Sequence, residues 1–259
     1  MSTEMLDRRF ATIGARVKIS GDRRGEPRID VRSDRRGEFF EVRFAGRGNA
    51  VDLEVVDVAP AERHLLLLAR GGDEKSKFLC GHDERHWFVA AVPESARGVT
   101  GVRTATAALR PALVRDAIER ARPKDAFRRR NAAYVRQGEW FFVPAPEVDP
   151  PMTLVLFDEP LSRGRGKAHL MQFAYRRGGQ VVWLSRRYPS GISDEQFRRF
   201  THDERRRDNW SQMIRDAEVF AKGAVRHPDH ATLVLRGWHR VAMNTEQAAR
   251  AMRHVAFLD

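Results

Sequence analysis

Short runs of alternating apolar and polar residues fill the first hundred positions and constrain the fold more than any other feature of the sequence. Residues 28–44, RIDVRSDRRGEFFEVRF, hold two such runs around a turn at Ser33–Gly37, where glycine suits a positive φ. A similar run precedes them at 16–20, and others follow at close spacing at 51–58, 64–70 and 77–92. This spacing predicts an antiparallel sheet or small barrel of about five to seven strands.

Helical spacing begins after residue 100. Apolar residues recur at helical intervals in 104–122, and Pro111 places the helix start near Arg110, because a proline needs no N–H partner in the first turn. Residues 124–137 continue as a second, basic helix, and 138–146 return to a strand. Four prolines within 143–152 mark the best linker.

The last hundred residues mix both patterns. Strands are expected at 152–160 and 180–189, with a helix at 168–177 between them, which suits a βαβ unit or an α+β arrangement. Ser193 and Gln196 have the spacing of a capping box. The remaining expected elements are helices at 192–200 and 203–223, a hairpin at 224–243 and a closing helix at 245–257.

Together these patterns predict an α+β fold, with a β-rich antiparallel N-terminal half followed by helices and a mixed α/β C-terminal half. The expected divisions are a β-rich domain (1–100), a helical and strand connection (101–142) and an α/β C-terminal domain (151–259).

The formal net charge of +12 favours a polyanionic partner, nucleic acid first. An arginine-rich composition changes which basic residue is used, but it does not by itself create an excess of positive charge. No run of about eighteen apolar residues predicts a membrane span, so no membrane partner is expected. The N-terminus lacks a secretory pattern and the chain has one cysteine, which favours a cytoplasmic location.

A possible metal site surrounds that cysteine in FLCGHDERHW, residues 78–87. Cys80 and His86 are expected as cross-strand neighbours in a hairpin, with His82 in the turn and Asp83 as a further ligand or an orienting acceptor. The spacing C-x-H-x3-H is not a usual structural zinc pattern, however. The same residues also suit a polar hairpin tip with Cys80 as a small buried hydrophobe, and a catalytic thiol is a weaker alternative.

A second histidine-rich tip lies at RHPDH, residues 226–230. Its Pro228-Asp229 centre is typical of a type I turn, but turn chemistry does not explain His227, His230 and the later His239. If the two tips meet in space, they would supply enough imidazole for a catalytic divalent metal such as zinc, or for a general base. The sequence does not say whether they meet.

Two basic segments have the composition of phosphate-binding sites. Arginines and aromatic side chains are interspersed in 126–142. Glycines separate basic residues in 163–167, and a helix is expected directly after this segment. The alternative for 126–142 is a solvated helix face, and the alternative for 163–167 is a surface loop. If residues 163–167 bind an anion, His169 would lie near it. The candidate nucleic-acid contacts are Arg128, Arg129, Arg130, Arg136, Trp140, Arg163, Arg165 and Lys167.

Asp158 and Glu159 are expected at the end of a strand, where carboxylates often hold Mg²⁺ in nucleases, although a strand-ending turn is the simpler explanation.

Taken together, the charge and the motifs predict a nucleic-acid-binding protein, acting on single strands or RNA through its arginines. The alternative is a metal-dependent hydrolase or nuclease that uses the histidine tips. A scaffolding subunit in a protein complex is a third hypothesis. The candidate catalytic residues are His82, His86, His227, His230, His239, Asp158 and Glu159, and the candidate metal ligands are Cys80, His82, His86, His227 and His230.

Overall fold

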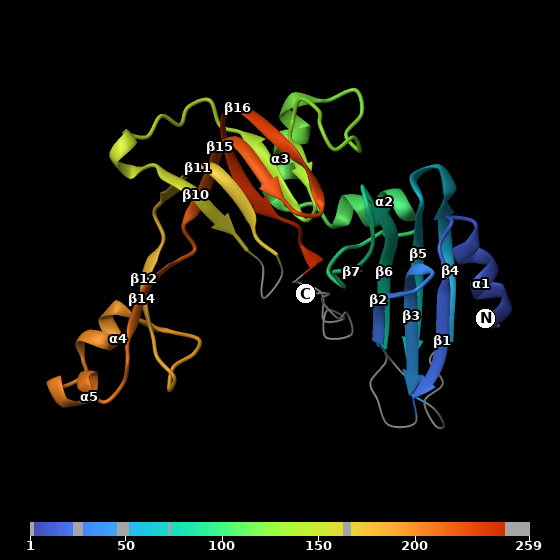
Figure 1. The fold of residues 1–259 in the computed structure, drawn as a ribbon, viewed down its shortest axis with the longest axis horizontal. Helices are drawn as coiled ribbons and strands as arrows, with labels where there is room; N and C mark the ends of the chain where they lie inside the picture. The colour runs from blue at the N-terminus through green and yellow to red at the C-terminus, as the bar shows by residue number, and fades with distance from the viewer. Residues whose placement is uncertain (1–2, 23–27, 46–51, 72–73, 163–166, 247–259) are drawn as a thin grey trace.

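The computed structural model describes residues 3–22, 28–45, 52–71, 74–162 and 167–246. In these ranges the chain is a strand-rich α+β protein with four sheets and few helices (Figure 1). None of the described helices is long and apolar enough to cross a membrane.

Two sheets form the N-terminal half beside helix α1 (Thr3–Ala11). Their strands lie close to the predicted positions, which confirms the two-residue periodicity. The first sheet has the order β1-β3-β2 and the second the order β4-β5-β6-β7. The strands are β1 (Val17–Asp22), β2 (Arg28–Asp34), β3 (Gly37–Ala45), β4 (Asp52–Ala59), β5 (His64–Gly71), β6 (Glu74–Asp83) and β7 (His86–Val92), with a 3-10 turn at Pro60–Glu62.

The expectation of a wholly antiparallel N-terminal sheet was wrong at β1. Strand β1 pairs with β3 on the side opposite β2 and runs parallel to it, with Val17 opposite Phe40. The two sheets enclose one core, in which Phe10, Phe40 and Phe78 are buried with Cys80. Strand β5 is buried on both faces, because helix α2 covers the far side of its sheet.

Two short helices replace the single helix expected over 104–122. Helix α2 (Val102–Ala108) ends before Pro111, which precedes α3 (Ala112–Ala121) as its N-cap residue. A proline cannot donate the hydrogen bond that would continue α2, so the chain restarts its helix there. Helix α3 packs against β9 (Trp140–Pro144) through Val114 and Phe141.

The second basic helix expected at 124–137 is wrong. Asp125 accepts a hydrogen bond from the backbone N–H of Phe127, and Asn131 accepts from those of Ala133 and Tyr134. These side-chain bonds fold the backbone into turns that compete with helix formation. Residues Val135–Gln137 then form strand β8, which pairs with β9.

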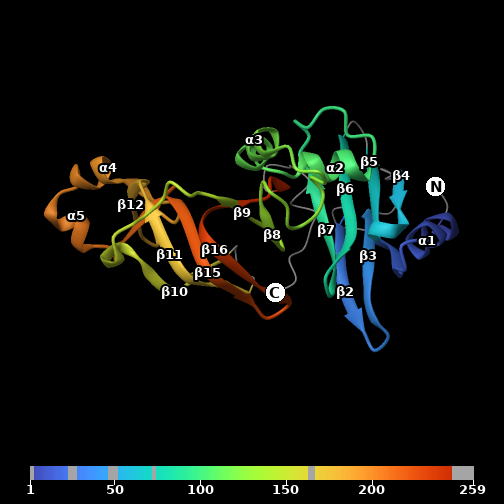
Figure 2. The same cartoon turned by 90° about the horizontal axis from the view of Figure 1, so that it is seen from above.

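A six-stranded sheet with the order β10-β11-β15-β16-β9-β8 forms the centre of the C-terminal half (Figures 1 and 2). Strands β8 and β9 therefore share a sheet with the strands that follow residue 151. One face of this sheet buries Phe142, Met171, Val225 and Leu235. The remaining bounds are β10 (Leu156–Leu161), β11 (His169–Arg177), β15 (Glu218–His227) and β16 (His230–Met243), with a 3-10 turn at Met152–Leu154 before β10.

The helix expected at 168–177, and with it the βαβ unit, was wrong, because this segment is the antiparallel strand β11. Burial alternates along its start, with His169 and Met171 inside and Leu170 outside. Its apolar residues satisfy both a helical and a strand pattern, and pairing with two neighbouring strands decides between them. The hairpin expected at 224–243 is confirmed as β15 and β16. The closing helix expected at 245–257 lies almost wholly outside the described residues.

Residues 178–217 form an arm that projects from the end of the six-stranded sheet (Figures 1 and 2). The predicted capping box at the start of α4 is confirmed, since Ser193 and Gln196 each bond the other's backbone. The long helix expected at 203–223 is wrong, because only α5 forms before the chain returns through β14 into β15. The arm contains β12 (Gln180–Leu184), β13 (Ile192–Ser193), α4 (Asp194–Arg198), α5 (His202–Arg206) and β14 (Ser211–Arg215).

Candidate metal centre

Three histidines meet at one end of the six-stranded sheet. His227 ends β15 and His230 begins β16, and the two are paired across the Pro228-Asp229 turn. His169 begins β11, the neighbour of β15, where Leu170 lies opposite Arg226. Adjacent antiparallel strands therefore bring the third imidazole beside the other two. We call His169, His227 and His230 the histidine triad.

The triad has the dimensions of a metal site. One ligand nitrogen from each ring lies within 4.8 Å of the other two. The ring centres are 4.1 Å apart for His169 and His227, and 4.7 Å apart for His227 and His230. His169 is 2% exposed, and the other two side chains are partly buried.

Gly138 leaves space beside two of the ring nitrogens. A Cβ at this position would lie 3.0 Å from Nε2 of His230 and 3.6 Å from Nε2 of His169. Both nitrogens therefore border the space that a side chain at position 138 would fill. Gly138 also has a φ of +57°, a conformation that glycine adopts without strain.

The hydrogen bonds of the triad leave ligand positions free. Neither ring nitrogen of His169 has a hydrogen-bond partner, although both are buried. Buried polar atoms are normally paired, so an unpaired imidazole indicates a missing ligand. Nδ1 of His230 lies 3.3 Å from Oε2 of Glu84, which leaves Nε2 for a metal.

Both ring nitrogens of His227, unlike those of His169, have hydrogen-bond contacts within the protein. Its Nδ1 accepts a hydrogen bond from the backbone N–H of Asp229 at 3.1 Å, and its Nε2 lies 3.2 Å from the carbonyl oxygen of Lys167. A metal ion bound by His227 would replace one of these two contacts.

Burial keeps the triad neutral. It lowers the pKa of His169 to about 3, and the two neighbouring histidines act in the same direction. Burial also lowers the pKa of His227 and of His230 below the ordinary value for histidine. At neutral pH all three rings are therefore uncharged, which is the form that binds a metal.

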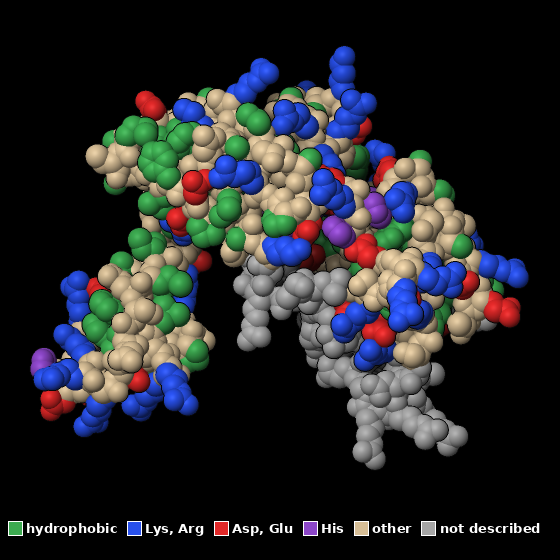
Figure 3. Space-filling view, in the orientation of Figure 1, with side chains coloured by type: hydrophobic (Ala, Val, Ile, Leu, Met, Phe, Trp, Pro, Cys, Tyr) green, Lys and Arg blue, Asp and Glu red, His purple; other side chains and the backbone are tan. Residues whose placement is uncertain are grey.

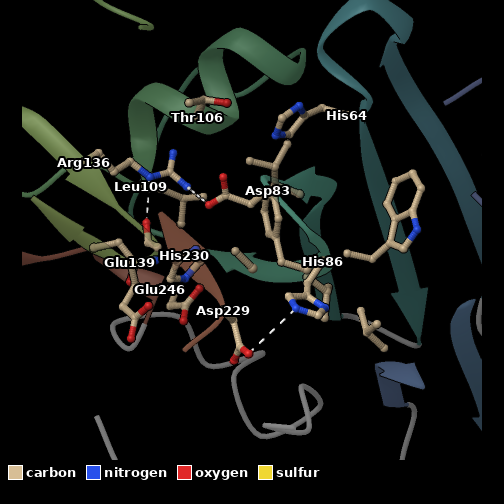
Figure 4. Close-up of a pocket in the computed structure, with 18 of the residues that line it drawn as sticks. His64, Asp83, His86, Thr106, Leu109, Arg136, Glu139, Asp229, His230 and Glu246 are labelled. Carbon is tan, nitrogen blue, oxygen red and sulfur yellow. Dashed lines mark hydrogen bonds and ion pairs between the residues drawn. The ribbon is translucent and has the colours of Figure 1, made fainter. Parts of the chain in front are cut away.

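The two histidine-rich tips meet in space. Oε2 of Glu84, at the first tip, accepts a hydrogen bond from the backbone N–H of Ala231 at 2.9 Å. Nε2 of His86 lies 4.0 Å from Oδ1 of Asp229 (Figure 4). The first tip thus supplies a carboxylate that contacts the triad from outside, while the ligand nitrogens come from the second tip and from β11.

A cavity of about 590 Å³ opens between the N-terminal sheets and the triad. Glu139, Glu246 and Asp229 surround His230 at its wall (Figure 4). Arg136 and Asp83 lie on the opposite side of His230 in the same view, with Nη2 of Arg136 3.4 Å from Oδ2 of Asp83. Apolar side chains, including Leu79, Phe88, Val89, Leu109, Phe127 and Phe141, complete the lining.

No protein-family model matches this chain. Neither the curated proteins nor the solved structures contain a significant match.

The structure separates the first predicted ligand group. Cys80 is fully buried in the N-terminal core, and burial raises the pKa of its thiol far above the ordinary value. His82 packs edge-on against Trp87, with ring centres 4.9 Å apart. Nδ1 of His86 contacts Glu38 at 2.7 Å. None of these three belongs to the described group of ligand atoms within 4.8 Å.

Three other catalytic candidates also lie outside the triad. Nδ1 of His239 lies 2.8 Å from the carbonyl oxygen of Gly237. Asp158 and Glu159 lie inside β10 rather than at its end, where they pair with Arg226 and Arg176. Each carboxylate therefore already has a cationic partner on another strand of the same sheet.

Most of the described candidates for nucleic-acid contact have partners within the protein. Arg129 pairs with Asp83 and Glu84. Arg128 lies 3.4 Å from Asp125, and Nζ of Lys167 lies 3.0 Å from Asp229. Trp140 is 8% exposed in the core of the six-stranded sheet, whereas Arg130 is exposed. Arg163 and Arg165 lie outside the described residues, and a strand follows them instead of the helix that an anion-binding loop requires.

Sequence reasoning missed several contributors to the site. His169 was expected in the first turn of a helix, near an anion held by the preceding loop, because β11 was expected to be that helix. The one available signal was the alternation of His169 with Met171, which places both on the buried face of a strand. Nothing in the sequence points to Glu84 or Gly138, because their roles arise from contacts between distant segments.

Proposed function

We propose that this protein is a metal-dependent hydrolase whose histidine triad binds a zinc ion. The observation that carries the proposal is a fully buried imidazole, His169, which has no hydrogen-bond partner and lies within ligand distance of two further imidazoles.

Zinc suits the donor set. Neutral imidazoles are favoured zinc ligands, and three of them leave a fourth, open position in a tetrahedral site. Gly138 and the cavity lie beside the triad that would hold this ion. A zinc ion bound there would supply Lewis-acid activation of water for hydrolysis near neutral pH.

The surrounding residues supply the remaining functions of such a site. Glu84 would orient His230 through its contact with Nδ1, as carboxylates do for metal-bound histidines. Glu139, on the cavity wall beside His230, is our candidate for the group that accepts a proton from the attacking water. The cavity, lined by apolar side chains and by charged ones such as Arg136, suits a small substrate or the end of a longer chain.

Metal content and activity test this proposal together. We expect the full chain, dialysed against zinc, to retain one zinc ion per molecule, and His169→Gln to retain none. His202→Gln is the matched control, because His202 is an exposed histidine on the arm. Equal zinc content in His169→Gln and in wild type would exclude the triad as the metal site.

Hydrolysis is then assayed with p-nitrophenyl acetate and bis(p-nitrophenyl) phosphate. A chelator should abolish turnover of at least one of them, and added zinc should restore it. Turnover that persists without metal, or is absent with zinc bound, would contradict the hydrolase assignment.

Nucleic-acid binding is the second candidate function, and the net charge of +12 favours it. Of the described arginines expected to carry it, Arg129 and Arg136 pair with carboxylates of the protein, whereas Arg128 and Arg130 are exposed.

A further inference from the structure

The arm is a small module with an aromatic core. Trp183 stacks on Phe197 at 3.9 Å between ring centres, and Tyr188 stacks on Trp210 at 5.6 Å. Phe200 contacts Trp210 in a tilted arrangement at 5.8 Å between ring centres. These partly buried rings pack against one another and hold the segments of the arm together.

Contacts within the arm bring two pairs of arginines to the same region. Arg186 and Arg187 lie in the turn between Ser185 and Tyr188, and Arg206 and Arg207 lie at the end of α5. The hydroxyl of Ser185 donates a hydrogen bond to Asp208 at 3.1 Å. Together with the stacking of Tyr188 on Trp210, this bond fixes the turn against the segment that follows α5.

Two further observations concern Arg187 and Arg207. The guanidinium of Arg187 lies 5.6 Å from the centre of the Tyr188 ring. Hydrogen bonds from Thr201 lower the pKa of Glu204, and the positive charges of Arg207 and Arg187 add to this effect. The positive charges of both arginines thus act on one carboxylate, although the two belong to separate segments.

These four arginines are exposed and form no ion pair within the described part of the chain. The other arginines of α4 and α5 are engaged. Arg198 pairs with Asp194, Arg199 pairs with Glu195, and Arg205 donates to the carbonyl oxygens of Phe197 and Arg198. Four guanidinium groups thus remain available to an external anion. Figure 3 shows basic side chains over the visible face of the arm.

We propose that the arm is a nucleic-acid-docking element, in which Arg186, Arg187, Arg206 and Arg207 contact the phosphate backbone. A guanidinium forms paired hydrogen bonds with a phosphate, and a chain of regularly spaced phosphates engages several guanidinium groups at once. Because arginine contacts to phosphates carry no sequence information, this binding is expected to be independent of sequence.

Fluorescence anisotropy with labelled single-stranded RNA, single-stranded DNA and duplex DNA tests this proposal. The measurements are made in EDTA, so that they are independent of the proposed metal site. We expect binding to at least one of the three that weakens steeply with salt, because each phosphate contact contributes about 0.7–0.9 to the slope of log K against log salt. Salt-insensitive binding, or no binding to any of them, would overturn the proposal.

The decisive variant replaces Arg186, Arg187, Arg206 and Arg207 with Gln. We expect its affinity to fall by at least about tenfold and its salt slope to decrease by about two to four. Replacing the same four with Lys should restore most of the affinity, which separates loss of charge from damage to the arm. The control replaces Arg8, Arg9, Arg35 and Arg36, which are exposed in the N-terminal half, and removes the same charge.

Equal loss in the arm variant and in this control would show that net charge alone drives binding, and would overturn the proposal. Binding to vesicles of anionic lipid or to an acidic protein, with no binding to nucleic acid, would also overturn the proposal. Loss of zinc from the His169→Gln variant should leave nucleic-acid binding unchanged, so failure of one proposal is distinguishable from failure of the other.

Discussion

Oε2 of Glu84 lies 3.3 Å from Nδ1 of His230, so that a carboxylate of one hairpin tip faces a histidine of the other. Glu84 lies in the turn between β6 and β7, and His230 begins β16 of the six-stranded sheet. This contact joins the two halves of the protein at the triad. Metal affinity should therefore depend on a residue that is not itself a ligand.

Glu84→Gln tests this dependence. The amide removes the negative charge facing His230 but keeps an oxygen that can accept from the N–H of Ala231. Because such orienting carboxylates raise ligand basicity, we expect zinc affinity to fall by about 10- to 100-fold. Competition with a chromophoric chelator measures it. Glu38→Gln is the control, because Glu38 contacts His86 and Trp87 but not the triad, and it should change zinc affinity little.

Gly138→Ala should block the metal position directly. The added methyl would lie 3.0 Å from Nε2 of His230, against the nitrogen that would bind zinc. A non-glycine residue at this φ also costs about 1–2 kcal/mol of folding free energy. Gly98→Ala controls for that cost, because Gly98 has a φ of +69° with nothing within 4 Å of an added Cβ. Zinc titration should show loss of binding in the first variant alone; equal binding in both would contradict this account of Gly138.

Cys80→Ala should leave zinc stoichiometry unchanged. The thiol is fully buried among apolar side chains, and burial raises its pKa, so it is neither a ligand nor a ready nucleophile. Iodoacetamide should therefore alkylate Cys80 only after denaturation, as mass spectrometry of the intact protein would show. Loss of zinc from Cys80→Ala with an unchanged circular dichroism spectrum would return the cysteine to the metal site.

His64 should make the protein sensitive to acid. Burial lowers its pKa from 6.5 to about 4, while its contact with the Glu62 carbonyl acts in the opposite direction. The unfolded chain then binds more protons than the folded one between these two values. Stability from this group is complete above pH 6.5 and is lost as the pH falls toward 4, by about 3 kcal/mol at most.

Urea unfolding in the presence of a chelator, between pH 7 and pH 4, measures this loss. His64→Gln should flatten the pH dependence over that range, and the exposed-residue control His202→Gln should not. An unchanged slope in His64→Gln would show that His64 is not the group responsible.

The N-terminal fold was predictable because its strands alternate apolar and polar residues between short turns. The same rule failed for β11, where Leu170, Met171, Phe173 and Ala174 satisfy both a helical and a strand spacing. It also failed at 124–137, where the side chains of Asp125 and Asn131 form turns that apolar spacing does not show. In both segments, local bonds or strand pairing outweigh periodicity.

The site was only partly predictable for a related reason. His227 and His230 attract notice as a pair around a turn, but their third partner depends on which strand lies beside β15. That neighbour is β11, and sequence spacing does not specify strand order. Cys80 is a second case. It lies on the core face of β6, and within the described part of the chain it forms no group of ligand atoms with His82 and His86, although they follow it by only two and six residues.

X-ray absorption spectroscopy of the zinc-loaded full chain tests the central claim most directly. We expect a first shell of nitrogen and oxygen at about 2.0–2.1 Å, with the scattering of three imidazoles and no sulfur. The His169→Gln variant should show no ordered zinc. A sulfur at about 2.3 Å, or fewer than two imidazoles, would show that the histidine triad is not the metal site.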